Sequence, residues 1–240
     1  MPSPAGPADA WLVPRLQMSL RPAAAPITQP VAKLGGQPVW LDKPFWPVSQ
    51  SFGTPMTFVG QLPVPGPELR MTYLFVTEDD WAVAETYDPD AGENALIVQP
   101  GGRTPDFLVG HEIDHGPSLW RHGATWVERV PVEFQVDLSA LDEADERALD
   151  EEFAWQEATR DGVLRDPPQG DRLPPRSYVG GSPVFWQAEV RVPEPWRFFY
   201  QLDGGEGWAD EPYALNFGGG TGYAFLSPDE KEGRFYWDRV

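Results

Sequence analysis

The sequence contains two similar stretches, and this repeat constrains the fold more than any other feature. Residues 34–40 read Leu-Gly-Gly-Gln-Pro-Val-Trp, and residues 179–186 read Val-Gly-Gly-Ser-Pro-Val-Phe-Trp. Each stretch is followed by a Phe-x-x-Gln segment ending at Gln61 or Gln201, and then by an apolar run beginning at Tyr73 or Tyr223. Two copies are too few for a solenoid, so the repeat predicts a duplicated β-rich half. The alternative is a chance match, because Gly-Gly-x-Pro is common turn chemistry.

Short apolar runs separated by Pro, Gly and Asp clusters are typical of antiparallel strands joined by tight turns. Residues 12–20 are expected to form an edge strand that is interrupted at Pro14, since proline cannot donate to a ladder. Further strands are expected at 71–77, 81–87, 95–100, 127–137, 183–192, 196–202, 213–217, 223–227 and 235–240.

One segment has the features of a helix. Ser139 is a suitable N-cap and Asp142 stands at the capping-box position. The helix should run from 140 to 160 and end near Gly162. The expected fold class is therefore α+β and β-dominated, with antiparallel sheets in two pseudo-duplicated halves and one prominent acidic helix.

The expected organisation is one integrated domain in four parts. Residues 1–33 form a Pro/Ala-rich arm, 34–137 the first β-rich half, 138–178 the acidic helix with a Pro-rich connector, and 179–240 the second half.

The charge balance restricts the class of partner. The chain has 37 acidic and 18 basic residues, a formal net charge of −19. This field repels nucleic acid and anionic membranes and attracts basic proteins. Ordinary solubility is the alternative reason for such acidity. There is no Cys, which excludes disulfides and thiolate chemistry. With no signal peptide and no apolar run of membrane-span length in the sequence, we expect a cytoplasmic protein.

Several ordered landmarks resemble the YwqG-like domain family over nearly the whole chain, from about residue 30. The landmarks are Lys33-Leu34-Gly35-Gly36-x-Pro38, Phe58-x-x-Gln61, Tyr73-x-Phe75, Gly180-Gly181-x-Pro183 with Gln187, Phe199-x-Gln201-Leu202-Asp203, Gly222-Tyr223-x-Phe225 and Trp237-Asp238. One segment departs from the family pattern: the acidic Trp-Gly-Asp-like stretch expected between Gln201 and Gly222 reads Glu-Gly-Trp-Ala-Asp at 206–210.

The resemblance implies a β-dominated fold with internal duplication and a function in bacterial conflict. Some members of the family are thought to be immunity proteins of polymorphic-toxin or secretion systems. It supplies no catalytic residues and no cofactor. We therefore expect a non-enzymatic, acidic binding protein that neutralises a cognate toxin, with a nuclease domain encoded by an adjacent gene as a candidate partner. A general protein-interaction module is an alternative.

The acidic face of the expected helix is the candidate contact surface. A nuclease toxin needs a basic groove for its substrate backbone, and carboxylates could occupy that groove while an aromatic side chain anchors the complex. The expected partner-binding residues are Asp142, Glu143, Asp145, Glu146, Asp150, Glu151 and Glu152, with Trp155 as the anchor. The alternative is an ordinary solvated helix face.

One motif points to metal chemistry. His111, Glu112 and His115 match His-Glu-x-x-His, in which two histidines one helical turn apart bind zinc and the glutamate activates water. The chemistry needs a helix, yet Gly110 precedes the motif and Gly-Pro follows it, so a polar surface loop is favoured. A metal-dependent hydrolase built on these three residues is kept as the alternative function.

Overall fold

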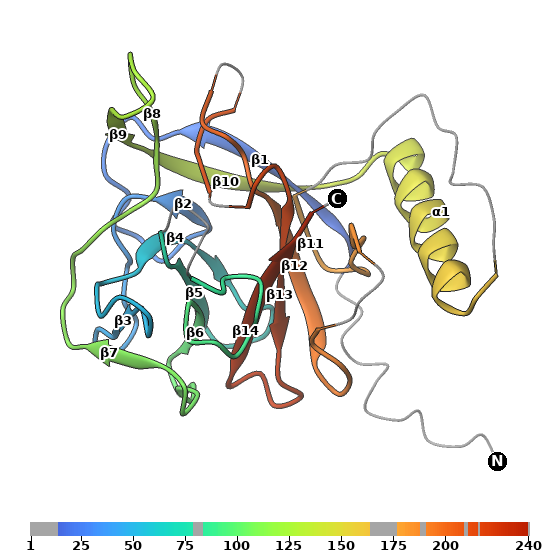
Figure 1. The fold of residues 1–240 in the computed structure, drawn as a ribbon, viewed down its shortest axis with the longest axis horizontal. Coiled ribbons are helices and arrows are strands. Elements are labelled where there is room, and N and C mark those ends of the chain that lie inside the picture. Colours follow the sequence, from blue (N-terminus) through green and yellow to red (C-terminus); the bar gives the residue numbers. More distant parts are fainter. Residues whose placement is uncertain are drawn as a thin grey trace.

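The computed structural model describes residues 14–78, 84–163, 177–187, 191–208, 211–215 and 217–239. Within these ranges the fold is α+β and β-dominated, with antiparallel strands and a single helix, as the sequence predicts (Figure 1). The strands are β1 Leu16–Pro22, β2 Lys33–Gly35, β3 Trp46–Val48, β4 Thr57–Pro63, β5 Met71–Val76, β6 Asn94–Gln99, β7 Val109–His111, β8 Trp120–His122, β9 Arg129–Pro131, β10 Glu133–Ala140, β11 Tyr178–Val179, β12 Arg197–Asp203, β13 Thr221–Leu226 and β14 Gly233–Asp238. The helix is α1 Glu143–Arg160.

Ten of the strands form one large sheet. Their order is β14-β13-β12-β11-β1-β10-β2-β4-β5-β6, and every neighbouring pair is antiparallel. The strands of the first half therefore lie on one side of the β1–β10 pair and those of the second half on the other. Two small sheets, β3–β7 and β8–β9, lie outside it.

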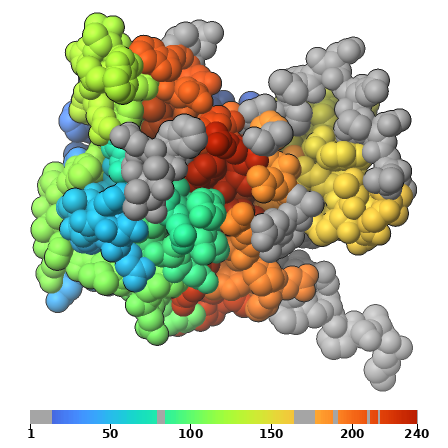
Figure 2. Space-filling model, in the orientation of Figure 1, coloured from blue at the N-terminus to red at the C-terminus, as the bar shows by residue number. Residues whose placement is uncertain are grey.

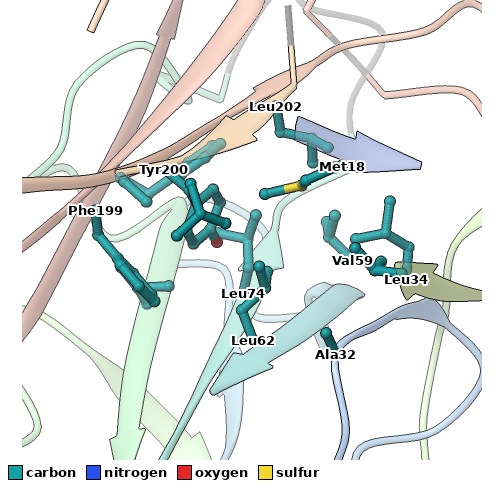
Figure 3. Close-up of a cluster of buried hydrophobic side chains, with 14 of the residues drawn as sticks. Met18, Ala32, Leu34, Val59, Leu62, Leu74, Phe199, Tyr200 and Leu202 are labelled. Carbon is teal, nitrogen blue, oxygen red and sulfur yellow. The ribbon is translucent and has the colours of Figure 1, made fainter. Parts of the chain in front are cut away.

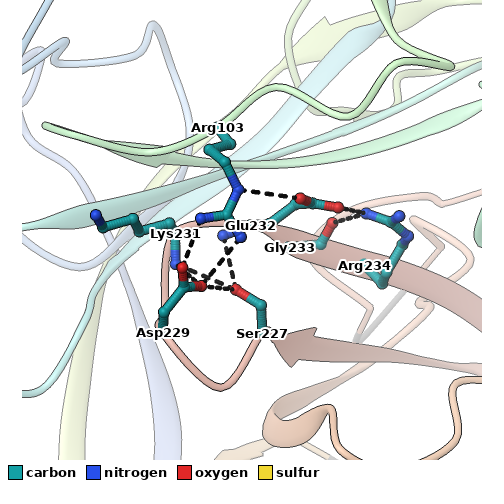
Figure 4. Close-up of polar contacts among 7 residues, drawn as sticks. All are labelled: Arg103, Ser227, Asp229, Lys231, Glu232, Gly233 and Arg234. Carbon is teal, nitrogen blue, oxygen red and sulfur yellow. Dashed lines mark hydrogen bonds and ion pairs between the residues drawn. The ribbon is translucent and has the colours of Figure 1, made fainter.

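The large sheet curls until its two edge strands lie beside each other. The Asn94 side-chain amide on β6 donates to the Phe235 carbonyl on β14 at 3.2 Å. Beyond the strand ends, Arg103 donates its backbone N–H to the Lys231 carbonyl and makes two side-chain bonds to Asp229 (Figure 4). These contacts close the seam between the two halves and protect edges that would otherwise be open to other chains.

Both faces of the sheet are buried along β5, β6 and β13, which read as apolar runs, whereas β1 and β10 at its middle are partly exposed. The inner faces meet in one shared core, in which Figure 3 labels Met18, Ala32, Leu34, Val59, Leu62, Leu74, Phe199, Tyr200 and Leu202. The outer face of the first half packs under Trp46 and its neighbours, and that of the second half packs under Phe185 and Trp196.

In each half, two consecutive glycines with a left-handed backbone conformation turn the chain from the sheet onto its outer face. Gly35 and Gly36 have φ of +70° and +65°, and Gly180 and Gly181 have +76° and +68°. Side chains rarely adopt this backbone conformation, and a Cβ on Gly35 would lie 2.0 Å from the Val132 carbonyl oxygen. The Gly-Gly pair is therefore required where the chain leaves the sheet.

In each half, a buried glutamine accepts a hydrogen bond from the segment that follows the Gly-Gly pair. The Gln61 side-chain oxygen accepts from the Val39 N–H at 2.9 Å. The Gln201 side-chain oxygen accepts from the Val184 N–H at 3.0 Å. The overlying segments are thus fixed to the sheet by the same type of bond at repeat-matched positions.

Helix α1 begins later than the sequence predicts. Asp142, not Ser139, is the N-cap, and its side chain accepts from the backbone N–H groups of Ala144 and Asp145. The Ser139 assignment was wrong because β10 continues through Ala140, paired with Leu16 of β1. The predicted end is confirmed at Gly162, which has φ of +79°. No helix in the described ranges is long and apolar enough to cross a membrane.

The strand from the Pro/Ala-rich arm is central and not an edge strand. β1 lies between β10 and β11 and is hydrogen-bonded to both. The expectation at 12–20 was wrong because β1 begins at Leu16, after Pro14, so this proline removes no donor from the ladder. Residues 1–13 of the arm and 164–176 of the Pro-rich connector lie outside the described residues.

The remaining strand predictions fall into two groups. Those at 71–77, 95–100, 196–202, 223–227 and 235–240 are confirmed to within a few residues by β5, β6, β12, β13 and β14. The strand at 127–137 is instead two strands, β9 and β10, which separate at Val132. The described parts of 81–87, 183–192 and 213–217 form no strand. In the last two segments apolar side chains such as Phe185 and Tyr213 pack against the sheet without joining its ladder, and Ala214 makes only isolated bridges. Residues 81–83, 188–190 and 216 lie outside the described ranges.

Candidate functional site

Some carboxylates of the predicted acidic surface on α1 bind other groups of the chain, and others are exposed to solvent. Asp142 caps the helix and Asp145 is buried. Arg15, at the start of β1, donates to Glu146 at 2.8 Å and to Asp150 at 3.1 Å. Glu146 and Asp150 therefore help to fix α1 against the sheet, whereas Asp142 stabilises the start of the helix itself.

The remaining four predicted residues of α1 differ in exposure. Glu143 and Glu151 are exposed, whereas Glu152 and Trp155 are half-buried. A surface hollow of about 590 Å³ has Glu143, Glu146, Asp150 and Glu151 in its lining. The structure therefore brings four of the seven predicted carboxylates together along one side of the helix.

The predicted metal motif lies on a strand and the loop that follows it. His111 ends β7, paired with Trp46 of β3, and Glu112 and His115 lie on the exposed loop. The His115 Nδ1 atom lies 3.0 Å from a carboxylate oxygen of Asp114. No group of three or more metal-ligating side chains gathers anywhere in the described ranges. The helical spacing that the motif requires is thus not realised.

A more enclosed hollow than the one on α1 lies beside the β8–β9 hairpin. A hollow of about 730 Å³ is lined by this hairpin, by the end of β5 and by the loop after β12. A second hollow of about 640 Å³ adjoins it and shares the residues Thr57, Thr77, Glu78 and Arg129. We call the two together the aromatic groove. Figure 2 shows the hairpin in yellow-green against the orange loop.

Exposed apolar side chains stand along the aromatic groove. Trp126 is 72% exposed and Val127 65%, both in the β8–β9 turn, and Trp208 is 45% exposed in the loop after β12. Phe52 lines the second hollow and is 41% exposed. Large apolar side chains that gather around a concavity are characteristic of an interaction site, whereas isolated ones are ordinary.

A stack of rings holds the hairpin against the loop after β12. The His122 ring lies parallel to Trp208, with centroids 4.2 Å apart, and Trp120 meets His122 edge-on at 5.0 Å. The His122 Nδ1 atom lies 2.7 Å from the Trp126 carbonyl oxygen. Because a carbonyl oxygen only accepts, Nδ1 carries the proton and fixes the ring orientation. These contacts fix the hairpin side of the groove without a bound partner.

A cation already occupies the middle of the groove. The Arg129 guanidinium lies 4.6 Å from the Trp120 ring centroid and 2.5 Å from a Glu78 carboxylate oxygen. The Thr57 hydroxyl donates to the other Glu78 oxygen at 3.4 Å, a weak bond. An indole face and a carboxylate together form a site suited to a planar guanidinium.

The Thr77 hydroxyl in the groove has neither a hydrogen-bond partner nor an ion-pair partner within the described residues. Thr77 is 2% exposed and lines both hollows, yet its hydroxyl makes no hydrogen bond there. Buried hydroxyls usually have a partner, so an unpaired one in a cavity wall marks a position where a ligand atom can bind.

Sequence reasoning missed these groove residues. Thr77 and Glu78 follow β5, Trp120 and Arg129 lie in the β8–β9 hairpin, and no motif links the two segments. The one local signal is the Trp126-Val127 pair in a short turn between polar strands, where burial is not expected.

Comparison of this chain with models of protein families, with curated proteins and with solved structures finds no match.

Proposed function

We propose that the chain is a non-enzymatic binding protein, and specifically an immunity protein that binds and neutralises a basic bacterial toxin. The observation that carries the proposal is the aromatic groove, a concave surface with Trp126, Val127 and Trp208 exposed beside it. Interface energy is concentrated in a few tryptophan, tyrosine and arginine side chains that fill pockets at the centre of the contact. A preformed groove with exposed indoles is suited to supply such anchors.

The charge of the chain supports a basic partner. A formal net charge of −19 accelerates the encounter with a cationic protein and rejects polyanions. Charge alone gives fast association and fast release, whereas buried aromatic anchors slow dissociation. The two properties together suit an inhibitor that must find a toxin quickly and hold it. The resemblance to the YwqG-like family adds the bacterial toxin context.

The two candidate contact surfaces lie far apart. α1 and the β8–β9 hairpin stand near opposite ends of the longest axis of the molecule (Figure 1). A partner of domain size cannot use both as one compact epitope. We assign the anchoring role to the aromatic groove, and steering at a distance to exposed carboxylates such as Glu143 and Glu151 on α1.

Within the described residues, nothing gathers the side chains that the hydrolase alternative requires. His111 and His115 lie on a strand end and an exposed loop, and neither belongs to the groove. A general interaction module would use the same groove, so the identity of the partner separates that alternative from immunity.

The test begins with capture of partners from a lysate of the native organism on the immobilised chain, washed at low and then at high salt. Each retained protein is then produced alone and titrated against the pure chain by calorimetry. A basic protein that binds one-to-one, and whose toxicity in cells is suppressed by co-expression of the chain, supports the proposal. If no retained protein binds the pure chain, or the bound protein stays fully active, the proposal is wrong.

Matched variants then locate the contact. Trp126→Ala with Trp208→Ala should weaken binding by about a hundredfold, mainly through faster dissociation, because each is a truncated anchor. Leu69→Ala is the control, since Leu69 is exposed but lies in the turn between β4 and β5, at the opposite ends of these strands from the groove. Glu143→Gln with Glu151→Gln should slow association at low salt and have no effect at high salt. If the α1 pair alone accelerates dissociation, the anchors lie on α1 and not in the groove.

A further inference from the structure

Two repeat-matched hydroxyls differ in how they are satisfied. Thr77 follows the last residue of β5 and donates its backbone N–H to the Glu93 carbonyl at 2.8 Å. Ser227 follows the last residue of β13 and donates its backbone N–H to the Glu232 carbonyl at 2.9 Å. The two residues therefore occupy the same place in their respective strand pairs.

The Ser227 hydroxyl makes three hydrogen bonds within the turn between β13 and β14. It donates to an Asp229 oxygen at 2.8 Å and accepts from the backbone N–H groups of Lys231 at 3.2 Å and Glu232 at 3.0 Å (Figure 4). The connection from β5 to β6 is much longer than that from β13 to β14, and the Thr77 hydroxyl faces the aromatic groove without a partner among the described residues. The Thr77 hydroxyl in the first half is therefore unpaired at the wall of a cavity, whereas the matched Ser227 hydroxyl in the second half stabilises a turn.

The same position in the groove already holds a guanidinium. Arg129 lies over Trp120 and against Glu78, and its side chain is 56% exposed, so it can leave without disturbing the core. Glu78 would then face the cavity beside Thr77, with an exposed indole face adjacent. The three groups offer a carboxylate, a hydroxyl oxygen and a π surface, which together match the donors and the plane of a guanidinium.

We propose that the groove receives an arginine side chain of the partner protein, which displaces Arg129 from Glu78 and Trp120 and hydrogen-bonds to the Thr77 hydroxyl. The inference rests on the proposed binding function and specifies its chemistry. Arg129 acts as an internal competitor that keeps Glu78 paired while the groove is empty. A carboxylate left unpaired in this partly buried position would be costly, so the exchange of one arginine for another keeps the charge balanced throughout.

The test uses small probes and needs no partner. The chain is labelled with ¹⁵N in its tryptophan indoles, and the Trp120 indole signal is followed by NMR during titration with N-acetyl-arginine amide. N-acetyl-citrulline amide is the uncharged isostere, and N-acetyl-lysine amide tests whether the site selects the guanidinium or any cation.

Arg129→Ala should bind the arginine probe about tenfold more tightly than the unaltered chain, because the internal competitor is gone. Glu78→Gln in the Arg129→Ala background should remove this gain, and Thr77→Val in the same background should weaken binding by about threefold through the lost acceptor. The citrulline probe should give no saturable shift. Arg121→Ala is the matched control, since it removes the same charge from the same hairpin outside the groove, and it should bind like the unaltered chain.

The inference is overturned if Arg129→Ala, with its other indole signals unchanged, shows no saturable shift, or if Arg121→Ala gives the same gain. An equal response to citrulline would also overturn it. Equal binding of the lysine probe would replace the guanidinium-specific site by a general cation site and so contradict the arginine assignment. If the probe behaves as expected but no protein partner exists, the proposed function fails and the arginine site stands. If the partner depends on Trp126 and Trp208 but the probe does not bind, only the arginine site fails.

Discussion

Tyr73 and Tyr223 make the same two hydrogen bonds in the two halves of the chain. The Tyr73 hydroxyl donates to the Val39 carbonyl at 2.7 Å and accepts from the Leu41 N–H at 3.1 Å. The Tyr223 hydroxyl shares its single proton between the Val184 carbonyl at 3.1 Å and a side-chain oxygen of Asp238 at 2.8 Å, and it accepts from the N–H of Trp186 at 3.2 Å. Each tyrosine thus holds the segment that follows a Gly-Gly turn against the outer face of its own strands.

The match extends to the irregularities of the strands. The pairing of β4 with β5 shifts register between Phe58 and Gly60, and that of β12 with β13 shifts between Phe198 and Tyr200. Bulges are built into specific positions and are not random defects. Together with the shared tyrosine bonds, they support our proposal that the sequence repeat is an internal duplication.

A duplication predicts losses of the same kind for matched changes. Tyr73→Phe should lower the free energy of unfolding by about 1–2 kcal/mol, because it leaves a backbone carbonyl and an N–H without their partner. Tyr223→Phe should cost at least as much, because it also removes a hydrogen bond to the buried Asp238. Urea denaturation followed by tryptophan fluorescence would measure both. Tyr87→Phe is the control, since Tyr87 is largely exposed, and it should change stability little. A large loss for one tyrosine and none for the other would contradict the equivalence.

Asp238 should make stability depend on pH in an unusual direction. It accepts from Tyr223 at 2.8 Å and from the N–H groups of Trp186 and Gln187 at 3.2 Å each, yet desolvation by burial raises its pKa above the ordinary value. A raised folded-state pKa gives stability that is present below the unfolded pKa and lost as the pH rises through the folded pKa. The stability difference between the unaltered chain and Asp238→Asn should therefore fall from pH 4 to pH 7. Denaturation of both proteins at several pH values measures it, and a difference that rises with pH would contradict the assignment.

Asp229 should show the opposite dependence. Hydrogen bonds from Arg103 and Ser227 lower its pKa below the ordinary value. Its contribution is then present above the unfolded pKa and lost as the pH falls through the folded pKa. Relative to Asp229→Asn, the unaltered chain should lose stability on acidification below about pH 4. High salt should reduce the effect because the pair is exposed. A salt-independent difference would show that the seam is held by other contacts.

The buried pair of Lys33 and Glu133 should tolerate joint replacement better than single replacement. Lys33 is fully buried, and its ammonium lies 2.7 Å from Glu133 and 3.1 Å from the Ile27 carbonyl oxygen. Glu133→Gln should cost about 3 kcal/mol, since it leaves a buried cation without its counter-charge. Lys33→Met combined with Glu133→Gln should recover most of this loss.

The pKa of Lys33 provides a check on the cause. Desolvation lowers this pKa, and removal of the Glu133 charge should lower it further. The stability loss of Glu133→Gln should then shrink as the pH rises and Lys33 loses its proton. A loss of constant size from pH 7 to pH 10 would attribute it to packing.

The local pattern of the sequence was sufficient to predict where most strands of the large sheet lie along the chain. It did not predict which strands pair with each other. β5 and β13 are short apolar runs bounded by turn residues, and both are where the pattern predicts them. The central place of β1 depends on pairing with β10, more than a hundred residues further along the chain, and no local signal encodes this. Ser139 and Asp142 are both good N-caps in sequence, and the length of β10 decides between them.

The candidate site was also harder to predict, because its residues are far apart in the sequence. The acidic face of α1 follows from helical periodicity, but Arg15, which binds two of its carboxylates, lies in a different segment. Thr77 and Arg129 meet only because the β8–β9 hairpin folds over the end of β5. A surface made from separate segments has no signature in any one of them.

The central position of β1 has a consequence for how the protein is made. A ribosome releases β1 before every other strand of the large sheet, yet both of its hydrogen-bonded neighbours, β10 and β11, emerge much later. Until then β1 has no partner, while β4, β5 and β6 can already pair with one another. The nascent chain therefore carries an unsatisfied strand until β10 has been made, and the two halves can join only after β11 and β12 have emerged as well.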